Sequence, residues 1–159
     1  MKFDEFKTKI DHYNKTVKTL RGELADHLKA TLQGLLDDLP NVESFSFEAY
    51  TPYFNDGEPC VYRVHEPRLR FKELSEEIKN SFKYGIDEDG VSQYCLDTKG
   101  WGKTLEFTNP VQAPLAKALT AITEKVKSVP KDVMLAAFDD HQRIRVSREG
   151  VKVEHFEHD

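Results

Sequence analysis

The side chains of this sequence that could do chemistry are six histidines, two cysteines and several short clusters of carboxylates. His155 and His158 lie among carboxylates in the run HFEHD, and these ligand types together can hold a divalent metal. Terminal segments are more often solvated and frayed, which favours the interpretation without a metal. Asp87 and Asp89 match part of a calcium-binding loop, but its first aspartate and its later ligand positions are missing. We therefore expect neither a metal nor a cofactor.

A nucleophile with a neighbouring base is the second kind of chemistry that these residue types allow. Cys60 could be the nucleophile, with His65 or His141 as its base. No spacing requires this, and a small buried thiol on the inner face of a strand is the simpler interpretation. Asp56 and Glu58 could form a carboxylate pair, although the turn sequence Asn-Asp-Gly already explains Asp56. The sequence has no phosphate-binding loop, nucleophile elbow, dinucleotide fingerprint or zinc spacing, so it indicates binding rather than catalysis.

A basic surface is predicted where alternating strand residues place arginines on outward positions. These arginines are Arg63, Arg143 and Arg145, and Arg68, Arg70 and Lys152 lie close to them in sequence. Arginine forks suit phosphate and carboxylate groups, so neighbouring strands would form an anion-binding face. The alternative is cross-strand pairing with Glu48 and Glu154, which alternate in step with the arginines.

A loop rich in aromatic residues is predicted at residues 50–60, where two prolines flank the turn sequence Asn-Asp-Gly. Its aromatic residues either contact a partner from the surface or pack inward and close the loop. Trp101 lies between two glycines and is either a binding anchor or a plug packed on the sheet. The candidate binding residues are Tyr53, Phe54, Asn55, Asp56, Glu58, Arg63, Trp101, Arg143 and Arg145.

The run YTPYFNDGEPCVY, at residues 50–62, resembles a motif of a family of small uncharacterised proteins from bacteriophages and bacteria. The C-terminal run at residues 135–159 is similar to the end of the same proteins, and the two runs cover about a quarter of the chain. The resemblance implies a phage-type origin and a fold layout, but no reaction.

Composition and charge narrow the class of protein. The chain has 159 residues, which suggests one domain, and its net charge of −5 argues against general nucleic-acid binding. Two cysteines are too few for a disulfide framework, so we expect a reducing cytoplasm. The resemblance implies that this is the cytoplasm of a bacterial host cell. The charged N-terminus predicts no signal peptide, and no segment is apolar for long enough to span a membrane.

A long helix is predicted at residues 2–39, before Pro40. Its first apolar residues alternate in steps of three and four, which is the a/d pattern of a coiled coil: Phe3, Phe6, Ile10, Tyr13, Val17, Leu20 and Leu24. A continuous helix would project from a compact domain and pair with another copy, as a homodimer. Alternatively, the helix breaks near Gly22 and folds back as a helix pair.

The remainder, residues 43–159, reads as an α+β core within a single domain, 1–159. The patterns predict two strands around the loop at residues 50–60, a helix at 72–83, a helix ending before Pro130, and three strands at 133–138, 142–147 and 151–156. The fold prediction is α+β, with a mostly antiparallel sheet of about five strands, helices on one face and a long N-terminal helix.

Three functions agree with these features. The first is a non-catalytic, phage-type protein that binds a macromolecule, with a protein partner in host interaction or counter-defence. The second is a small enzyme or ligand-binding protein that uses the arginine face for an anionic small molecule. The third is a structural accessory subunit assembled through the N-terminal helix.

Overall fold

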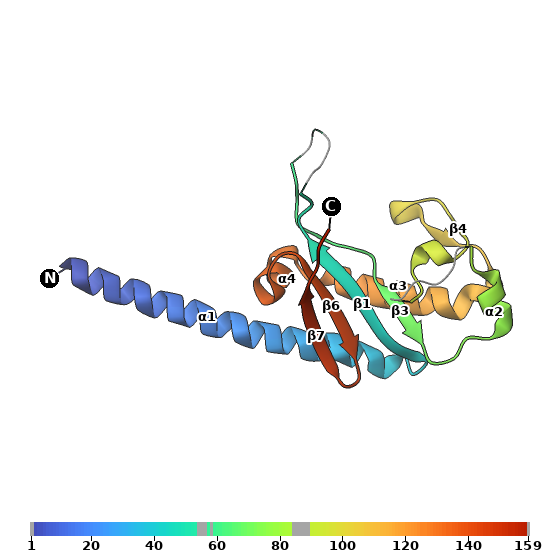
Figure 1. Ribbon diagram of the computed structural model, residues 1–159, viewed down its shortest axis with the longest axis horizontal. Helices are drawn as coiled ribbons and strands as arrows, with labels where there is room; N and C mark the ends of the chain where they lie inside the picture. Colours follow the sequence, from blue (N-terminus) through green and yellow to red (C-terminus); the bar gives the residue numbers. More distant parts are fainter. Residues whose placement is uncertain (1, 54–56, 58, 84–89, 159) are drawn as a thin grey trace.

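The computed structural model describes residues 2–53, 57, 59–83 and 90–158 (Figure 1). Its helices are α1 (Lys2–Gly34), α2 (Glu76–Ser81), α3 (Ala113–Ser128) and α4 (Lys131–Phe138), with short 3-10 turns η1 (Leu35–Asp38), η2 (Gln93–Cys95), η3 (Gly102–Thr104) and η4 (Pro110–Gln112). Its strands are β1 (Val42–Tyr50), β2 (Arg63–Val64), β3 (Arg68–Phe71), β4 (Thr98–Lys99), β5 (Glu106–Phe107), β6 (Gln142–Ser147) and β7 (Gly150–His155).

The main sheet has five antiparallel strands and confirms the predicted α+β fold. Its order is β2-β1-β6-β7, and β3 pairs with the same edge of β1 as β2 does. β2 and β3 come from the second predicted strand, which buried Pro67 interrupts as expected. β4 and β5 form a separate two-stranded sheet that the sequence did not predict.

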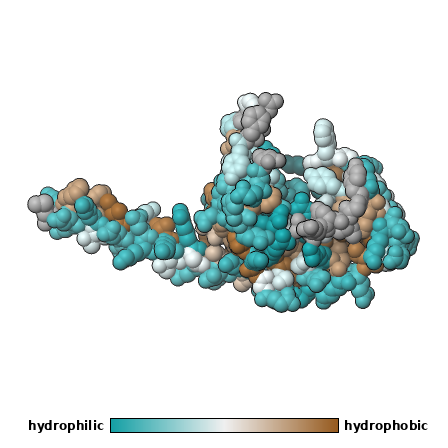
Figure 2. Space-filling model, viewed as in Figure 1, coloured by the Kyte–Doolittle hydropathy of each residue, from teal (hydrophilic) through white to brown (hydrophobic). Residues whose placement is uncertain are grey.

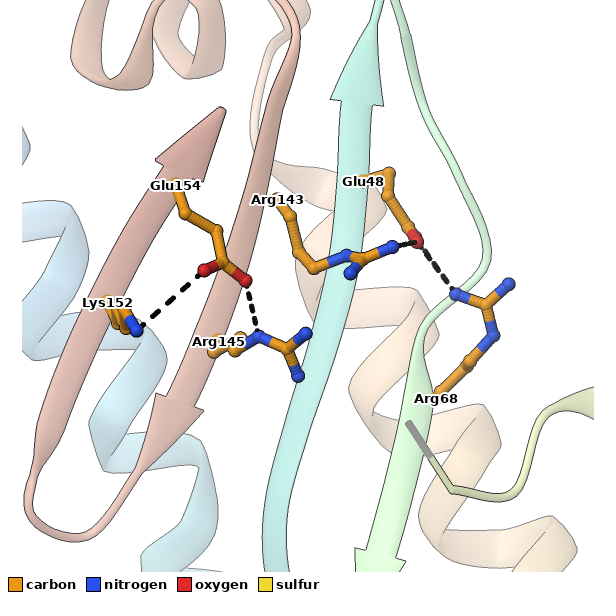
Figure 3. Close-up of polar contacts among 6 residues, drawn as sticks. All are labelled: Glu48, Arg68, Arg143, Arg145, Lys152 and Glu154. Atoms are coloured by element: carbon orange, nitrogen blue, oxygen red, sulfur yellow. Dashed lines mark hydrogen bonds and ion pairs between the residues drawn. The ribbon is translucent and has the colours of Figure 1, made fainter. Parts of the chain in front are cut away.

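The core lies between one face of the main sheet and the helices. Along β1, Phe45, Phe47 and Ala49 point into this core, opposite Val146 and Ile144 of β6. The helices contribute further buried side chains: Leu28, Leu32, Leu115, Leu119, Ile122, Val126 and Met134. Figure 3 shows helices behind the strands and charged side chains on the opposite face.

Helix α1 is continuous through Gly22, so the alternative of a break there is wrong. Its 33 residues span about 50 Å at 1.5 Å per residue, and its N-terminal half projects away from the rest of the molecule (Figure 1). The side chain of Leu28 is buried against the core, whereas those of Phe3 and Tyr13 are exposed. No helix within the described residues is long and apolar enough to cross a membrane.

The predicted strand at residues 133–138 is wrong, because this segment is helix α4. A short apolar run does not by itself distinguish a buried strand from a buried helix. Pro130 precedes the first turn, and the run then contains the helix-favouring residues methionine, leucine and alanine. Met134 and Phe138, four residues apart, are both buried, which is the spacing of one helix face.

Candidate functional site

The outer face of the main sheet holds a buried carboxylate between two arginines. Glu48 on β1 lies directly opposite Arg143 on β6, and the side chain of Glu48 is only 7% exposed. Oε1 of Glu48 accepts hydrogen bonds from Arg143 at 3.1 Å and from Arg68 at 2.8 Å (Figure 3). The guanidinium of Arg143 also lies over the ring of Phe156, 4.7 Å from its centroid. This carboxylate neutralises the centre of the predicted arginine face.

A second carboxylate on the same face pairs with a further arginine. Nε of Arg145 donates to Oε1 of Glu154 at 2.6 Å, and Nζ of Lys152 lies 3.8 Å from Oε2 (Figure 3). The hydrogen bond from Arg145 holds the pKa of Glu154 below its usual value. The structure therefore shows the cross-strand pairing that was one of the two alternatives for these arginines.

Among the residues that the structure describes, the strands carry more basic than acidic side chains on this face. The paired strands place six basic side chains on it against Glu48 and Glu154: Arg63, Arg68, Arg70, Arg143, Arg145 and Lys152. A hollow of about 470 Å³ opens over part of the face. Its polar side chains are those of Ser44, Ser46, Arg70, Arg145, Ser147, Glu149 and Lys152, so one carboxylate lies among the cations. Hydroxyl groups beside several cations are a suitable lining for an anion.

A stack of aromatic and histidine rings lies where β1 enters the predicted loop. Tyr50 stacks between His65 and His158, with ring centroids 4.1 and 3.9 Å apart. Tyr53 stacks on His158 at 4.3 Å and on His141 at 4.9 Å. Nδ1 of His141 lies 2.7 Å from Nε2 of His158. These five rings, here called the aromatic–histidine stack, join the loop to the C-terminal end of the described chain.

The first residue after β1, Thr51, is fixed by a carboxylate from the turn before β6. Asp140 accepts hydrogen bonds from the backbone N–H of Thr51 at 2.8 Å and from its hydroxyl at 2.7 Å. The N–H of His141 also donates to this carboxylate at 2.8 Å. Burial raises the pKa of Asp140, but these hydrogen bonds outweigh it and keep the pKa below its usual value.

The loop itself is described only in part. Tyr53 is 59% exposed although it stacks on two histidines, so it is partly packed and partly accessible. Phe54, Asn55, Asp56 and Glu58 lie outside the described residues, as do Asp87 and Asp89 of the partial calcium-loop match. The interpretation of Cys60 as a buried thiol is wrong, because Cys60 is exposed and precedes the short strand β2.

Trp101 is 85% exposed, so it is not a plug on the main sheet. It lies in the connection between β4 and β5, and this separate sheet holds it away from the core. Gly100 beside it has a φ of 75°, and a Cβ there would lie 2.4 Å from the carbonyl oxygen of Thr104. The Gly-x-Gly setting therefore serves a tight backbone approach that leaves the indole in solvent.

His158 was expected in a frayed terminus, but it packs between Tyr50 and Tyr53. The backbone N–H of Phe156 donates to the carbonyl of His141 at 2.8 Å, which carries the pairing of β6 and β7 beyond β7. The sequence signal that this segment continues the sheet was the alternation of residues along β7. Asp140, Thr51 and the histidines meet through long-range contacts, which no local pattern predicts.

His65 makes the stability of the fold depend on pH below about 6.5. Burial lowers the pKa of His65, so the folded protein holds this ring neutral while the unfolded chain takes up a proton below its ordinary pKa of about 6.5. We expect the free energy of unfolding in urea to fall from pH 7.5 to pH 5.5.

The matched variant for this pH effect is His65→Phe, which keeps a ring on Tyr50 but does not titrate. Nε2 of His65 is buried without a hydrogen-bond partner in the described structure, so phenylalanine forfeits no bond at that atom. The variant should lose less stability between the two pH values than the native chain. Asp140 and Glu154 have lowered pKa values, so their contribution to the free energy of unfolding changes only below about pH 4.5, outside the range from pH 7.5 to pH 5.5. An identical loss in the native chain and the variant contradicts the assignment to His65.

The described residues contain no group of three or more histidine, cysteine or acidic side chains placed to hold a metal ion. The described geometry offers four accessible features: the basic face with its hollow, the aromatic–histidine stack, exposed Trp101 and the projecting half of α1. A scan against protein-family models, a search of curated proteins and a search of solved structures each found no match to this chain.

Proposed function

We propose that this chain is a non-catalytic macromolecule-binding protein that docks another helix along the projecting half of α1. We call residues 2–23 the arm. The observation that supports this proposal most directly is the row of exposed apolar side chains on one side of the arm, visible as brown patches in Figure 2. Their exposed fractions are 63% for Phe3, 58% for Phe6, 41% for Ile10, 67% for Tyr13 and 57% for Leu20.

The arm needs a partner for two physical reasons. A helix of about 20 residues that packs on nothing is marginally stable in water, because most helical stability in proteins comes from tertiary packing. Each large apolar side chain contributes roughly 1.5–3 kcal/mol when it is fully buried. Covering the exposed part of five such side chains on each of two helices gives a gain of the same order as the roughly 4–15 kcal/mol that association costs.

The loop end of the molecule is the second contact surface in this proposal. Tyr53 presents a partly exposed ring that the aromatic–histidine stack holds in place, so little entropy is lost when a partner covers it. The resemblance of residues 50–62 to a phage and bacterial motif supports a host or phage protein as the partner. Host interaction and counter-defence are the roles that this origin favours.

Two glutamates placed in the apolar row test the proposal. Phe6→Glu with Tyr13→Glu should abolish association through the arm, because each buried, unpaired carboxylate costs several kcal/mol. The control is Thr8→Glu with Thr19→Glu, which adds the same charge on exposed positions outside the row. Light scattering and capture of proteins from bacterial lysate are measured for both variants. Unchanged association in the first variant contradicts the proposal, and self-association without any capture favours the structural accessory role.

A second function, recognition of a small anionic molecule, is favoured by one observation. The hollow over the outer sheet face brings the cations of Arg70, Arg145 and Lys152 together with the hydroxyls of Ser44 and Ser46. Glu154 pairs with two of these cations, so an anion has to compete with that carboxylate or join it. Guanidinium and ammonium groups beside hydroxyls in one hollow support binding of a phosphate or carboxylate group.

Thermal unfolding with inorganic phosphate and with nucleotides tests the hollow. A ligand at ten times its dissociation constant adds about 1.4 kcal/mol to the free energy of unfolding, which raises the melting temperature by a few degrees. Arg145→Ala should abolish this rise, measured against the melting temperature of the variant without ligand. Lys99→Ala, an exposed change on β4, is the control and should retain the rise. If Arg145→Ala retains it as well, the hollow is not the binding site.

A further inference from the structure

We propose that the arm of a second copy of this chain covers the arm, and that the two arms run antiparallel with Phe3 of each opposite Leu20 of the other. This inference rests on the proposed docking role of the arm and names the partner. We call the part of the protein that follows the arm the body. The inference follows from three features of the described chain: where the body begins along α1, where the exposed apolar row is centred, and which charges flank the row.

The body of the protein excludes a parallel partner. Leu20, Leu24 and Leu28 follow at intervals of four, and each step of four turns a helix position by only about 40°. The apolar row therefore continues directly into Leu28, which the core buries, and α1 packs here against α4, β6 and β7. A parallel partner lying on the row would run on into the space that this body occupies. An antiparallel partner ends there instead, because its N-terminus reaches the point where the body begins.

The extent of the exposed row fits an antiparallel pair of equal arms. The row runs from Phe3 to Leu20, and its midpoint lies between Ile10 and Tyr13. An antiparallel pair centred on that midpoint places Phe3 opposite Leu20, Phe6 opposite Val17 and Ile10 opposite Tyr13. In this register every member of the row meets an apolar side chain of the second copy, and neither arm extends past the other into solvent.

The charges beside the row favour the same arrangement. In a parallel pair, Lys2 of each arm would face Lys7 of the other, which is a like-charge contact repeated twice. In an antiparallel pair, residues that flank the row on the same side of each helix face each other. Lys2 therefore faces Glu23 of the second copy, and this contact also occurs twice. The other flanking lysines, Lys7 and Lys9, then face uncharged residues, asparagine and threonine respectively. The charge pattern therefore opposes one orientation and supports the other.

The arrangement places the two bodies at opposite ends of a shared rod. Twenty overlapping residues at 1.5 Å each separate them by about 30 Å. Each copy then presents its own loop end, one near either end of the rod, so the dimer is bivalent. A partner that carries two suitable sites binds such a dimer more tightly than it binds one copy.

Disulfide trapping on the full-length chain tests the orientation. Cys60→Ser removes the exposed thiol, and Phe6→Cys or Val17→Cys is then added singly. In the antiparallel pair, two Phe6 positions lie about 16 Å apart along the axis, beyond the roughly 7 Å Cα separation that a disulfide spans. We expect a mixture of the two single variants to form the mixed disulfide on mild oxidation, while neither variant alone cross-links to itself. A parallel pair gives the opposite result.

Three outcomes overturn the inference. Self-cross-linking of Phe6→Cys shows a parallel pair, and light scattering that gives a trimer or tetramer contradicts the two-arm arrangement. A monomer at high concentration, with no cross-link in the mixture, excludes self-association altogether. In that last case the proposed function still stands if the native chain captures another protein and Phe6→Glu with Tyr13→Glu does not, so the two failures are distinguishable.

Discussion

Glu48→Ala is expected to lower the free energy of unfolding by about 3 kcal/mol, measured by urea denaturation at pH 7. The carboxylate is almost fully buried on the sheet and binds two arginines whose side chains are 30% and 24% exposed. Its removal takes away the carboxylate that Arg68 and Arg143 share from the two sides of β1. Because both guanidiniums retain some contact with water, the loss should fall at the lower end of the range for broken buried pairs.

The matched control for Glu48 is Glu154→Ala on the same face. The side chain of Glu154 is 33% exposed, and its partner Arg145 is 37% exposed, so solvent screens this pair and its removal should cost about 1 kcal/mol or less. Glu48→Met combined with Arg143→Met replaces a buried pair by apolar side chains and should recover part of the loss. Equal losses for Glu48→Ala and Glu154→Ala would contradict the role assigned to burial.

The parts of this fold that the sequence predicts are those that a local period defines. Steps of three and four specify the helix of residues 2–34, and alternation in residues 142–147 specifies which arginines face outward and which carboxylates they meet. The apolar run at residues 133–138 has no such period, and its helix is chosen by packing of Met134 and Phe138. The prediction failed there because tertiary contacts decided between two local structures.

The surface features also differ in whether a local sequence pattern predicts them. The basic face follows from strand alternation, but the depth of Glu48 does not, because it depends on arginines from two other strands. The aromatic–histidine stack joins residues about 90 positions apart in the chain, as the hydrogen bond from Thr51 to Asp140 illustrates. Contacts of this kind arise from the assembled sheet, so a single sequence gives the residue types without their proximity.

Arg148 explains how the arm keeps a fixed direction relative to the body. This residue lies in the turn between β6 and β7, and its guanidinium donates to the carbonyl oxygens of Val42 at 2.6 Å, Leu36 at 3.1 Å and Leu39 at 3.2 Å. The carbonyls of Leu36 and Leu39 also accept the backbone N–H groups of Leu39 and Val42, so the guanidinium adds a second, charged donor to each of them. In return, Gln33 of α1 donates to the carbonyl oxygen of Arg148 at 2.8 Å.

Arg148→Ala is therefore expected to lower the free energy of unfolding by about 2 kcal/mol, since hydrogen bonds from a charged donor contribute roughly 1.5–3 kcal/mol each and this residue remains partly in water. Arg148→Lys should recover only a small part, because one ammonium cannot reach carbonyls on several sides as the planar fork does. Glu149→Ala, the exposed neighbour in the same turn, is the control and should change stability by less than about 0.5 kcal/mol.

The hydrogen bonds of Arg148 to these carbonyls are here called the clamp. Hydrogen exchange distinguishes loss of the clamp from a general loss of stability. The amides at residues 35–42, where α1 ends and β1 begins, should exchange faster in Arg148→Ala than in the native chain. Amides in the centre of α3 should change only in proportion to the global free energy of unfolding. Uniform acceleration across the chain would contradict a local clamp. A selective effect would show that the sheet holds the arm through its β6–β7 turn, and an arm held in one direction loses less entropy when a second helix docks on it.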